Sequence, residues 1–204
     1  MNAEIAEGEE ERNAKEGIWI SFICLLGAFR MYKTAPKHDD SNGYEVPEWL
    51  NALSYRVLGA CIEVHRTFGP GLLERIYEQA VCHELALAKI PFASQVPVSL
   101  SYKGLSIDGL RLDLVIDSVI VLELKAVESV PEVHLSQLVS YCRACDAPLG
   151  LLVNFNVHVL KAGMYRRLNR PSIQRHSEKR AAAGLAPTIS TRSTQETCSI
   201  SLTP

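Results

Sequence analysis

The chain has 204 residues, enough for one domain with extensions, and 47% of them are hydrophobic, which suits a soluble protein with a packed core. The formal net charge is −2, so overall charge favours neither nucleic acid nor a membrane surface as a partner. The six scattered cysteines predict reduced thiols in a cytoplasmic protein. One CxxC pair, Cys142 and Cys145, has no second Cys or His pair at metal-ligand spacing, so we interpret both as structural.

Residues 1–46 do not have the pattern of a folded domain. The apolar run 17–29 is shorter than the ~20 residues that span a bilayer, and the acidic segment before it has the wrong charge for a secretory signal. We leave open whether this run is buried, faces a partner, or reflects a translation start placed too early, since Met31 follows it. Residues 31–46 are polar and turn-rich, typical of a linker. We therefore expect residues 1–46 to lie outside the fold.

The two helices expected first lie on either side of a turn. Apolar residues recur at three- and four-residue steps over 48–67, which predicts a helix. The sequence FGPG at 68–71 ends it, because proline and glycine break helices. A second helix is expected over 72–89.

Three β-like runs follow, over 92–102, 105–116 and 119–127. The turn sequences between them, YKG and DS, are short, so the runs predict an antiparallel meander. Residues 149–156, LGLLVNFN, are apolar throughout and predict a strand buried on both faces.

The remaining elements complete an α/β arrangement. Pro131 suits the first turn of a third helix that runs to about Cys145, and residues 157–169 suit a short helix or an edge element. The order ααβββαβ predicts a mixed β-sheet flanked by helices. Residues 171–204 are rich in Ser, Thr, Ala and Pro and predict a disordered tail, which leaves 47–170 as the domain.

Two charges interrupt the third β-like run, VIVLELKAV. Side chains alternate along a strand, so Glu123 and Lys125 share a face. A hairpin that turns near Asp117 and Ser118 brings Asp113 towards that face. One interpretation is a salt bridge of Lys125 with a carboxylate, which is weak evidence for stability. The other is a divalent metal site, since clustered carboxylates repel each other unless a cation lies between them.

Two helices offer further polar groups. His134, Gln137 and Tyr141 form one stripe of the third helix. Taken alone, the stripe is more simply an ordinary polar face, although Gln and Tyr would suit orientation of a phosphate or a metal-bound water. Glu74 lies in the first turn of the second helix, where an ordinary surface carboxylate is the simpler interpretation for the residue taken alone. We interpret His134 as a helix-surface histidine rather than a general base.

The segment Gly71-Leu-Leu-Glu74-Arg-Ile-Tyr77 resembles the signature of the GxxExxY protein family, a branch of the PD-(D/E)XK nuclease superfamily. The resemblance covers most of 49–169, including GACIEVHRTFGPGLLERIYEQAV, LRLDLVID and VIVLELKAVE. It implies a restriction-endonuclease-like core in which Asp113 and Glu123-Leu124-Lys125 occupy the signature positions.

The resemblance also implies a function, a nuclease that hydrolyses phosphodiester bonds with Mg²⁺, or with Mn²⁺ as a substitute. Asp113, Glu123, Glu74 and the main-chain carbonyl of Leu124 would hold the metal. The implied catalytic set is Glu74, Asp113, Glu123, Lys125, Gln137 and Tyr141.

The implied partner is nucleic acid, DNA before RNA, with no membrane involved. A homodimer would suit cutting of both strands, although oligomeric state cannot be read from the sequence. The alternative function is a catalytically silent module of nuclease fold that binds nucleic acid or protein. Glycoside hydrolysis by paired carboxylates is disfavoured by the adjacent Lys125.

Overall fold

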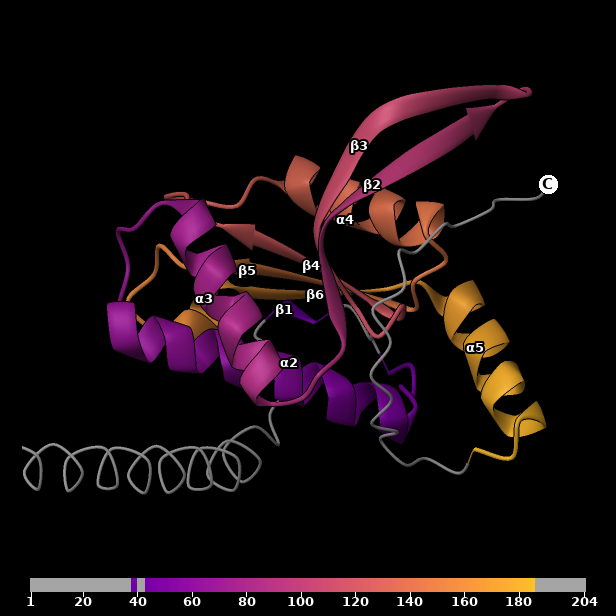
Figure 1. Cartoon of the computed structure of the whole chain (residues 1–204), viewed down its shortest axis with the longest axis horizontal. Helices are drawn as coiled ribbons and strands as arrows, with labels where there is room; N and C mark the ends of the chain where they lie inside the picture. Colours follow the sequence, from indigo (N-terminus) through magenta and orange to yellow (C-terminus); the bar gives the residue numbers. More distant parts are fainter. Residues whose placement is uncertain (1–37, 40–42, 186–204) are drawn as a thin grey trace, which may run out of the picture. The chain divides into compact units, whose positions relative to one another are not determined.

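The computed structural model describes residues 38–39 and 43–185 (Figure 1). The chain divides into two units, 1–34 and 35–204, and all described residues belong to the second. The apolar run 17–29 and most of the expected linker therefore lie outside the described residues.

A single sheet of six strands carries the fold, in the order β1-β6-β5-β4-β3-β2. Neighbouring strands are antiparallel in β2/β3, β3/β4 and β5/β6, and parallel in β4/β5 and β1/β6. The mixed sheet predicted from the sequence is confirmed. The strands are β1 His38–Asp39, β2 Phe92–Tyr102, β3 Leu105–Ile116, β4 Ile120–Lys125, β5 Leu149–Asn154 and β6 Met164–Leu168.

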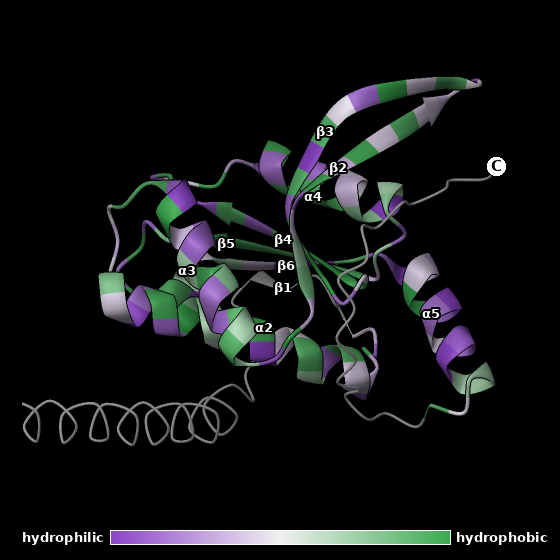
Figure 2. Ribbon diagram, in the orientation of Figure 1, coloured by the Kyte–Doolittle hydropathy of each residue, from purple (hydrophilic) through white to green (hydrophobic). Residues whose placement is uncertain are grey.

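Helices cover both faces of this sheet, each over its own apolar cluster (Figure 2). On one face Leu122 and Leu124 pack with residues of α2 and α3, such as Val57 and Val81. On the other face Val121 packs with residues of α4. The helices are α2 Glu48–Phe68, α3 Glu74–Leu87, α4 Glu132–Ala144, the short 3-10 helix η1 Leu160–Gly163 and α5 Arg170–Ala182.

The turn between β3 and β4 sets the register of the sheet centre. Asp117 and Ser118 both have positive φ, 48° and 57°, and with Val119 they form the three-residue turn between the paired residues Ile116 and Ile120. The N–H of Val119 donates to the carbonyl of Ile116 at 2.9 Å and closes the turn. The ladder then pairs Leu114 with Leu122, and one step further along the same register Asp113 meets Glu123.

Beyond the sheet, β2 and β3 continue as a two-stranded ribbon that extends away from the helices (Figure 1). Val98 pairs with Leu110, but Leu100 pairs with Ile107, so two residues of β3 oppose one of β2 in a bulge. Gly109, one of those two residues, has a φ of 111°, a conformation that favours glycine. The outer ribbon carries half-exposed apolar side chains, namely Leu100, Tyr102, Leu105 and Ile107.

Three features differ from the sequence-based boundaries. Residues 170–182 form helix α5, with Ser172 and Ile173 buried, so the prediction of a disordered tail was wrong for this segment. Strand β1 pairs with β6, and Val46 joins the core, so the fold begins before residue 47. Residues 157–169, left open between helix and edge element, form η1 and β6.

Two narrower points concern thiols and membranes. Cys142 and Cys145 lie on and just after α4, and both are buried, in agreement with a structural role. No helix within the described ranges has both the length and the apolar character needed to cross a membrane.

Candidate active site

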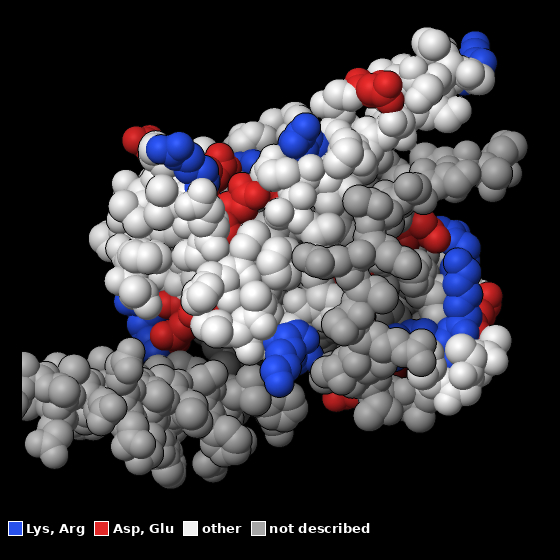
Figure 3. Space-filling model, in the orientation of Figure 1, with Lys and Arg blue, Asp and Glu red and all other residues white. Residues whose placement is uncertain are grey.

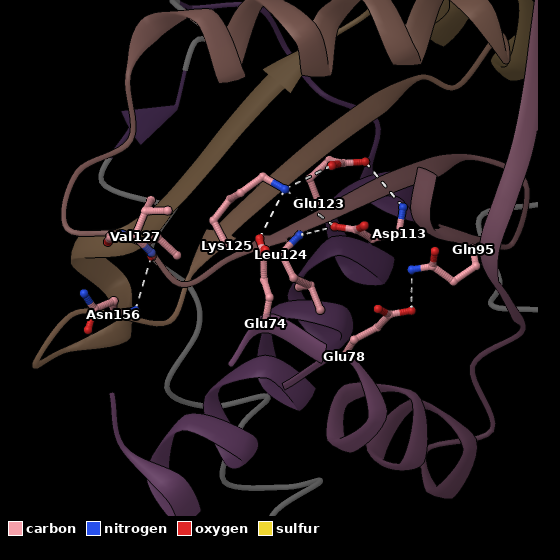
Figure 4. Close-up of polar contacts among 10 residues, drawn as sticks. Glu74, Glu78, Gln95, Asp113, Glu123, Leu124, Lys125, Val127 and Asn156 are labelled. Carbon is pink, nitrogen blue, oxygen red and sulfur yellow. Dashed lines mark hydrogen bonds and ion pairs between the residues drawn. The ribbon is translucent and has the colours of Figure 1, made fainter. Parts of the chain in front are cut away.

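One ammonium group lies among three carboxylates beside the sheet (Figure 4). The Nζ atom of Lys125 is 3.3 Å from an oxygen of Glu74, 3.6 Å from one of Glu123 and 3.9 Å from one of Asp113. The four residues come from α3, β3 and β4. Strand alternation and the hairpin predicted that Asp113, Glu123 and Lys125 meet, and the family resemblance implied that Glu74 joins them. All four are named the carboxylate cluster below.

The hairpin of β3 and β4 positions two of the carboxylates. The N–H of Leu124 donates to Oδ2 of Asp113 at 2.9 Å, and the N–H of Asp113 lies 3.5 Å from Oε1 of Glu123. The last paired residues of this ladder are Leu114 and Leu122. If the ladder continued, the N–H of Leu124 would donate to the main chain of β3, and here it donates to the Asp113 side chain instead. Asp113 and Glu123 are thereby fixed against each other by main-chain geometry.

Glu74 reaches the cluster from the start of helix α3. The loop before it contains Gly71, whose φ of 102° is readily adopted by glycine. The Glu74 side chain is 47% exposed, against 9% for Glu123, so Glu74 forms the solvent side of the cluster. Its position at the helix N-terminus also favours a negative charge.

Burial and crowding perturb the charges of this cluster. Burial, together with the neighbouring charge of Asp113, raises the pKa of Glu123 to about 7, although Lys125 opposes the rise. Burial lowers the pKa of Lys125, but Asp113, Glu123 and Glu74 raise it by more, and the net result is a pKa above the usual value. Lys125 therefore stays protonated near neutral pH, while Glu123 is poised between its two protonation states.

Helix α4 places only part of its polar stripe near the cluster. Burial and the charge of Glu123 raise the pKa of the Tyr141 hydroxyl, with Lys125 opposing, so this side chain is within electrostatic reach. Gln137 is exposed one turn earlier, and no contact joins it to the cluster in the described part of the chain. His134 is half-buried, and its Nδ1 atom is enclosed without a hydrogen-bond partner.

Sequence reasoning missed Gln95 of β2. The pairs Ser94–Leu114 and Val96–Leu112 place Gln95 opposite Asp113, yet Gln95 has a φ of 53°. Its side-chain amide donates to Glu78 of α3 at 2.8 Å (Figure 4). A non-glycine residue with positive φ next to a charged cluster is a common sign of a functional site, and nothing in the sequence signals it.

Three arginines of the domain are engaged in contacts within the chain. Arg166 is 2% exposed and donates to Asn51 at 2.7 Å, so it is a core residue. Arg66 pairs with Glu63, and Arg167 donates to the carbonyl of Arg166. The described part of the surface in Figure 3 accordingly mixes acidic and basic side chains.

The donor set of the carboxylate cluster fits a hard divalent cation. Asp113 and Glu123 offer carboxylate oxygens, and the carbonyl of Leu124 lies on the same side of β4 as the N–H that meets Asp113. Among residues 38–39 and 43–185 no group of three His, Cys, Asp or Glu side chains is placed to hold a metal ion, so the candidate donors are the two carboxylates of the hairpin. A cation held by two carboxylates and completed by water or phosphate oxygens is the arrangement that Mg²⁺ favours.

Two comparisons with known proteins bear on the family of the chain. No curated protein is similar to the chain. A family model described as the PD-(D/E)XK nuclease superfamily matches residues 51–168, more than half of the chain, and includes the whole carboxylate cluster. The superfamily predicted by resemblance is confirmed, and the chain belongs to the PD-(D/E)XK nuclease superfamily.

Proposed function

We propose that the domain is a Mg²⁺-dependent nuclease that hydrolyses phosphodiester bonds of DNA. The observation that carries the proposal is the meeting of Lys125 with Glu74, Asp113 and Glu123. A buried carboxylate and a partly buried one beside an ammonium are poorly explained by stability alone, because such groups are costly to bury. The same groups suit a reaction in which negative charge builds up on a phosphate.

Asp113, Glu123 and the Leu124 carbonyl would hold the metal, with Glu74 binding through water. PD-(D/E)XK nucleases generally use divalent metals, and Mg²⁺ is our specific assignment, with Mn²⁺ as a substitute. When bound, such an ion polarises a phosphate and lowers the pKa of water. The raised pKa of Glu123 supports this assignment, since a cation relieves the repulsion between the two carboxylates.

The protein's own groups would perform the positioning. Lys125 stays charged in its acidic surroundings, so its ammonium would orient the attacking water or stabilise charge on the phosphate. Tyr141 and Gln137 of α4 would donate hydrogen bonds to the phosphate backbone of the substrate. Their uncharged donors suit this task, because an added cation there would compete with the metal for the carboxylates.

Two finer assignments belong to the same proposal. Membership of the GxxExxY family rests on Gly71, Glu74 and Tyr77, and DNA as substrate rests on the resemblance. A homodimer would place two such sites on the two strands of a duplex. The assay below therefore compares both nucleic acids in single-stranded and duplex form.

The test is cleavage of labelled DNA and RNA by the purified full-length chain with Mg²⁺, Mn²⁺ or chelator. We expect metal-dependent cleavage by the wild type, and a loss of at least roughly 100-fold in Glu123→Ala and Lys125→Ala. Lys179→Ala, a change to an exposed lysine of α5, is the matched control and should retain full activity. If calorimetry detects no divalent ion on the wild type and nothing is cut, the nuclease assignment fails. The silent binding module would then account for the fold.

A further inference from the structure

Tyr77 is buried completely in the apolar core although it carries a polar hydroxyl. That hydroxyl donates to the carbonyl of Gly69 at 2.6 Å and accepts the N–H of Leu72 at 3.1 Å. Both partners lie in the loop that leads into α3, and Glu74 is the first residue of that helix. The Tyr77 hydroxyl thus links Gly69 and Leu72 across the loop before α3. Tyr77 lies about one helical turn after Glu74.

The ring of Tyr77 is connected through Phe155 to the backbone of Lys125, the partner of Glu74 in the ion pair. It stacks on Phe155 with 4.3 Å between ring centroids and an interplanar angle of 16°. The N–H of Phe155 donates to the carbonyl of Lys125 at 2.7 Å, just beyond the β4/β5 ladder. One side chain therefore contacts both the loop before Glu74 and the residue that holds the backbone of Lys125.

We propose that Tyr77 is a positioning residue that sets the approach of Glu74 to Lys125. Glu74 is the most exposed of the three carboxylates, yet it makes the shortest contact with the ammonium, at 3.3 Å. Without a fixed loop, a half-exposed glutamate at a helix start would spread over several rotamers. The inference rests on the proposed function only for its consequence in catalysis, because the geometry itself can be tested without turnover.

Tyr77→Phe is the informative variant, since it keeps the ring and its stack on Phe155 and removes only the hydroxyl. Leu72 and Gly69 lie at or near the surface and can bond to water instead, so the variant is expected to fold. We expect kcat to fall roughly 10- to 100-fold with KM within about twofold, as for a misplaced group in the site. Tyr102→Phe, at an exposed tyrosine of the ribbon, is the control and should match the wild type.

A double-mutant cycle separates positioning from general weakening. If Tyr77 acts through Glu74, Glu74→Gln should lower kcat far less in the Tyr77→Phe protein than in the wild type. Additive losses, or losses that follow the melting temperature, would overturn the proposal.

A measurement without turnover covers the case of an inactive wild type. Proton exchange at the Leu72 amide and at the Lys125 ammonium, followed by NMR, should both accelerate in Tyr77→Phe and remain unchanged in Tyr102→Phe. Unchanged exchange at the Lys125 ammonium would refute the positioning role. Failure of the nuclease assay alone would refute the proposed function and leave this result in place.

Discussion

Glu123 carries a charge that the metal-free protein holds at a cost. Burial and the neighbouring Asp113 raise its pKa from 4.5 to about 7, so the folded state binds a proton more tightly than the unfolded state. For a raised pKa, the stabilising contribution is complete below the unfolded value and is lost as pH rises through the folded value. In chelator, this contribution should therefore decline between about pH 4.5 and 7, by on the order of 1–3 kcal/mol.

Glu123→Gln isolates the pH-dependent contribution of Glu123 to stability, because glutamine resembles the protonated carboxyl. The free energy of unfolding, measured with urea across this pH range, should differ little between the two proteins at pH 4.5. The wild type should fall below the variant as pH approaches 7. A divalent ion should raise the free energy of unfolding of the wild type near pH 7 but not that of the variant. A difference that does not depend on pH would show that Glu123 is ionised throughout and paired with Lys125.

The individual residues of the site differ in how well sequence patterns predict them. Strand alternation was enough to place Glu123 and Lys125 on one face, and the turn signal at Asp117 and Ser118 was enough to bring Asp113 near them. Gln95 was missed because its side chain reaches Glu78 only through a left-handed backbone conformation, for which glutamine gives no signal. Glu74 needed the family resemblance, since a carboxylate at a helix start is ordinary.

At the scale of elements, helix α4 packs directly on a glycine of β5. A Cβ added to Gly150 would lie 2.7 Å from Cγ of Leu138 and 2.8 Å from Sγ of Cys142, closer than side chains approach. Gly150→Ala should therefore push α4 outward and destabilise the protein by about 1–3 kcal/mol.

The displacement of α4 would also move Tyr141, which lies on the same helix. We expect Gly150→Ala to weaken cleavage beyond its effect on the folded fraction. Lys179→Ala, at an exposed position of α5, is the control for the measurement of activity. Wild-type stability in Gly150→Ala would mean that α4 sits further from β5 than the structure has it.

The elements that the sequence placed well have strong internal periods, and those it misjudged do not. Strands β2 and β3 were predicted with their observed bounds, because alternation and turn residues define both ends. Helix α5 has Ile173 as its one large aliphatic residue, so its sequence, RPSIQRHSEKRAA, has no apolar face to detect. Its attachment comes from tertiary contacts instead, in which Arg175 and the Ser172 hydroxyl bind Asp146.

At the scale of the whole molecule, the boundary of the core is the main difference from the sequence-based prediction. A segment predicted to be a tail contributes Ile173 to the cluster under α2 and α3, where it is 1% exposed. The ribbon of β2 and β3, which has a stronger apolar pattern, leaves Ile107 45% exposed. Apolar content along the chain would rank the ribbon as more buried than α5, and the structure shows the reverse. Burial depends on what lies opposite a segment in space.

Two identical substitutions test this assignment. Ile173→Ala should lower the free energy of unfolding by about 2–4 kcal/mol, since it leaves a cavity where α5 meets the sheet. Ile107→Ala removes the same atoms from a half-exposed position and should change stability by at most about 0.5 kcal/mol. Urea unfolding of the full-length chain gives both values under one condition. Equal losses in the free energy of unfolding would mean that Ile107 is covered as fully as Ile173, by something outside the described residues. A negligible loss for Ile173→Ala would mean that α5 does not pack on the core.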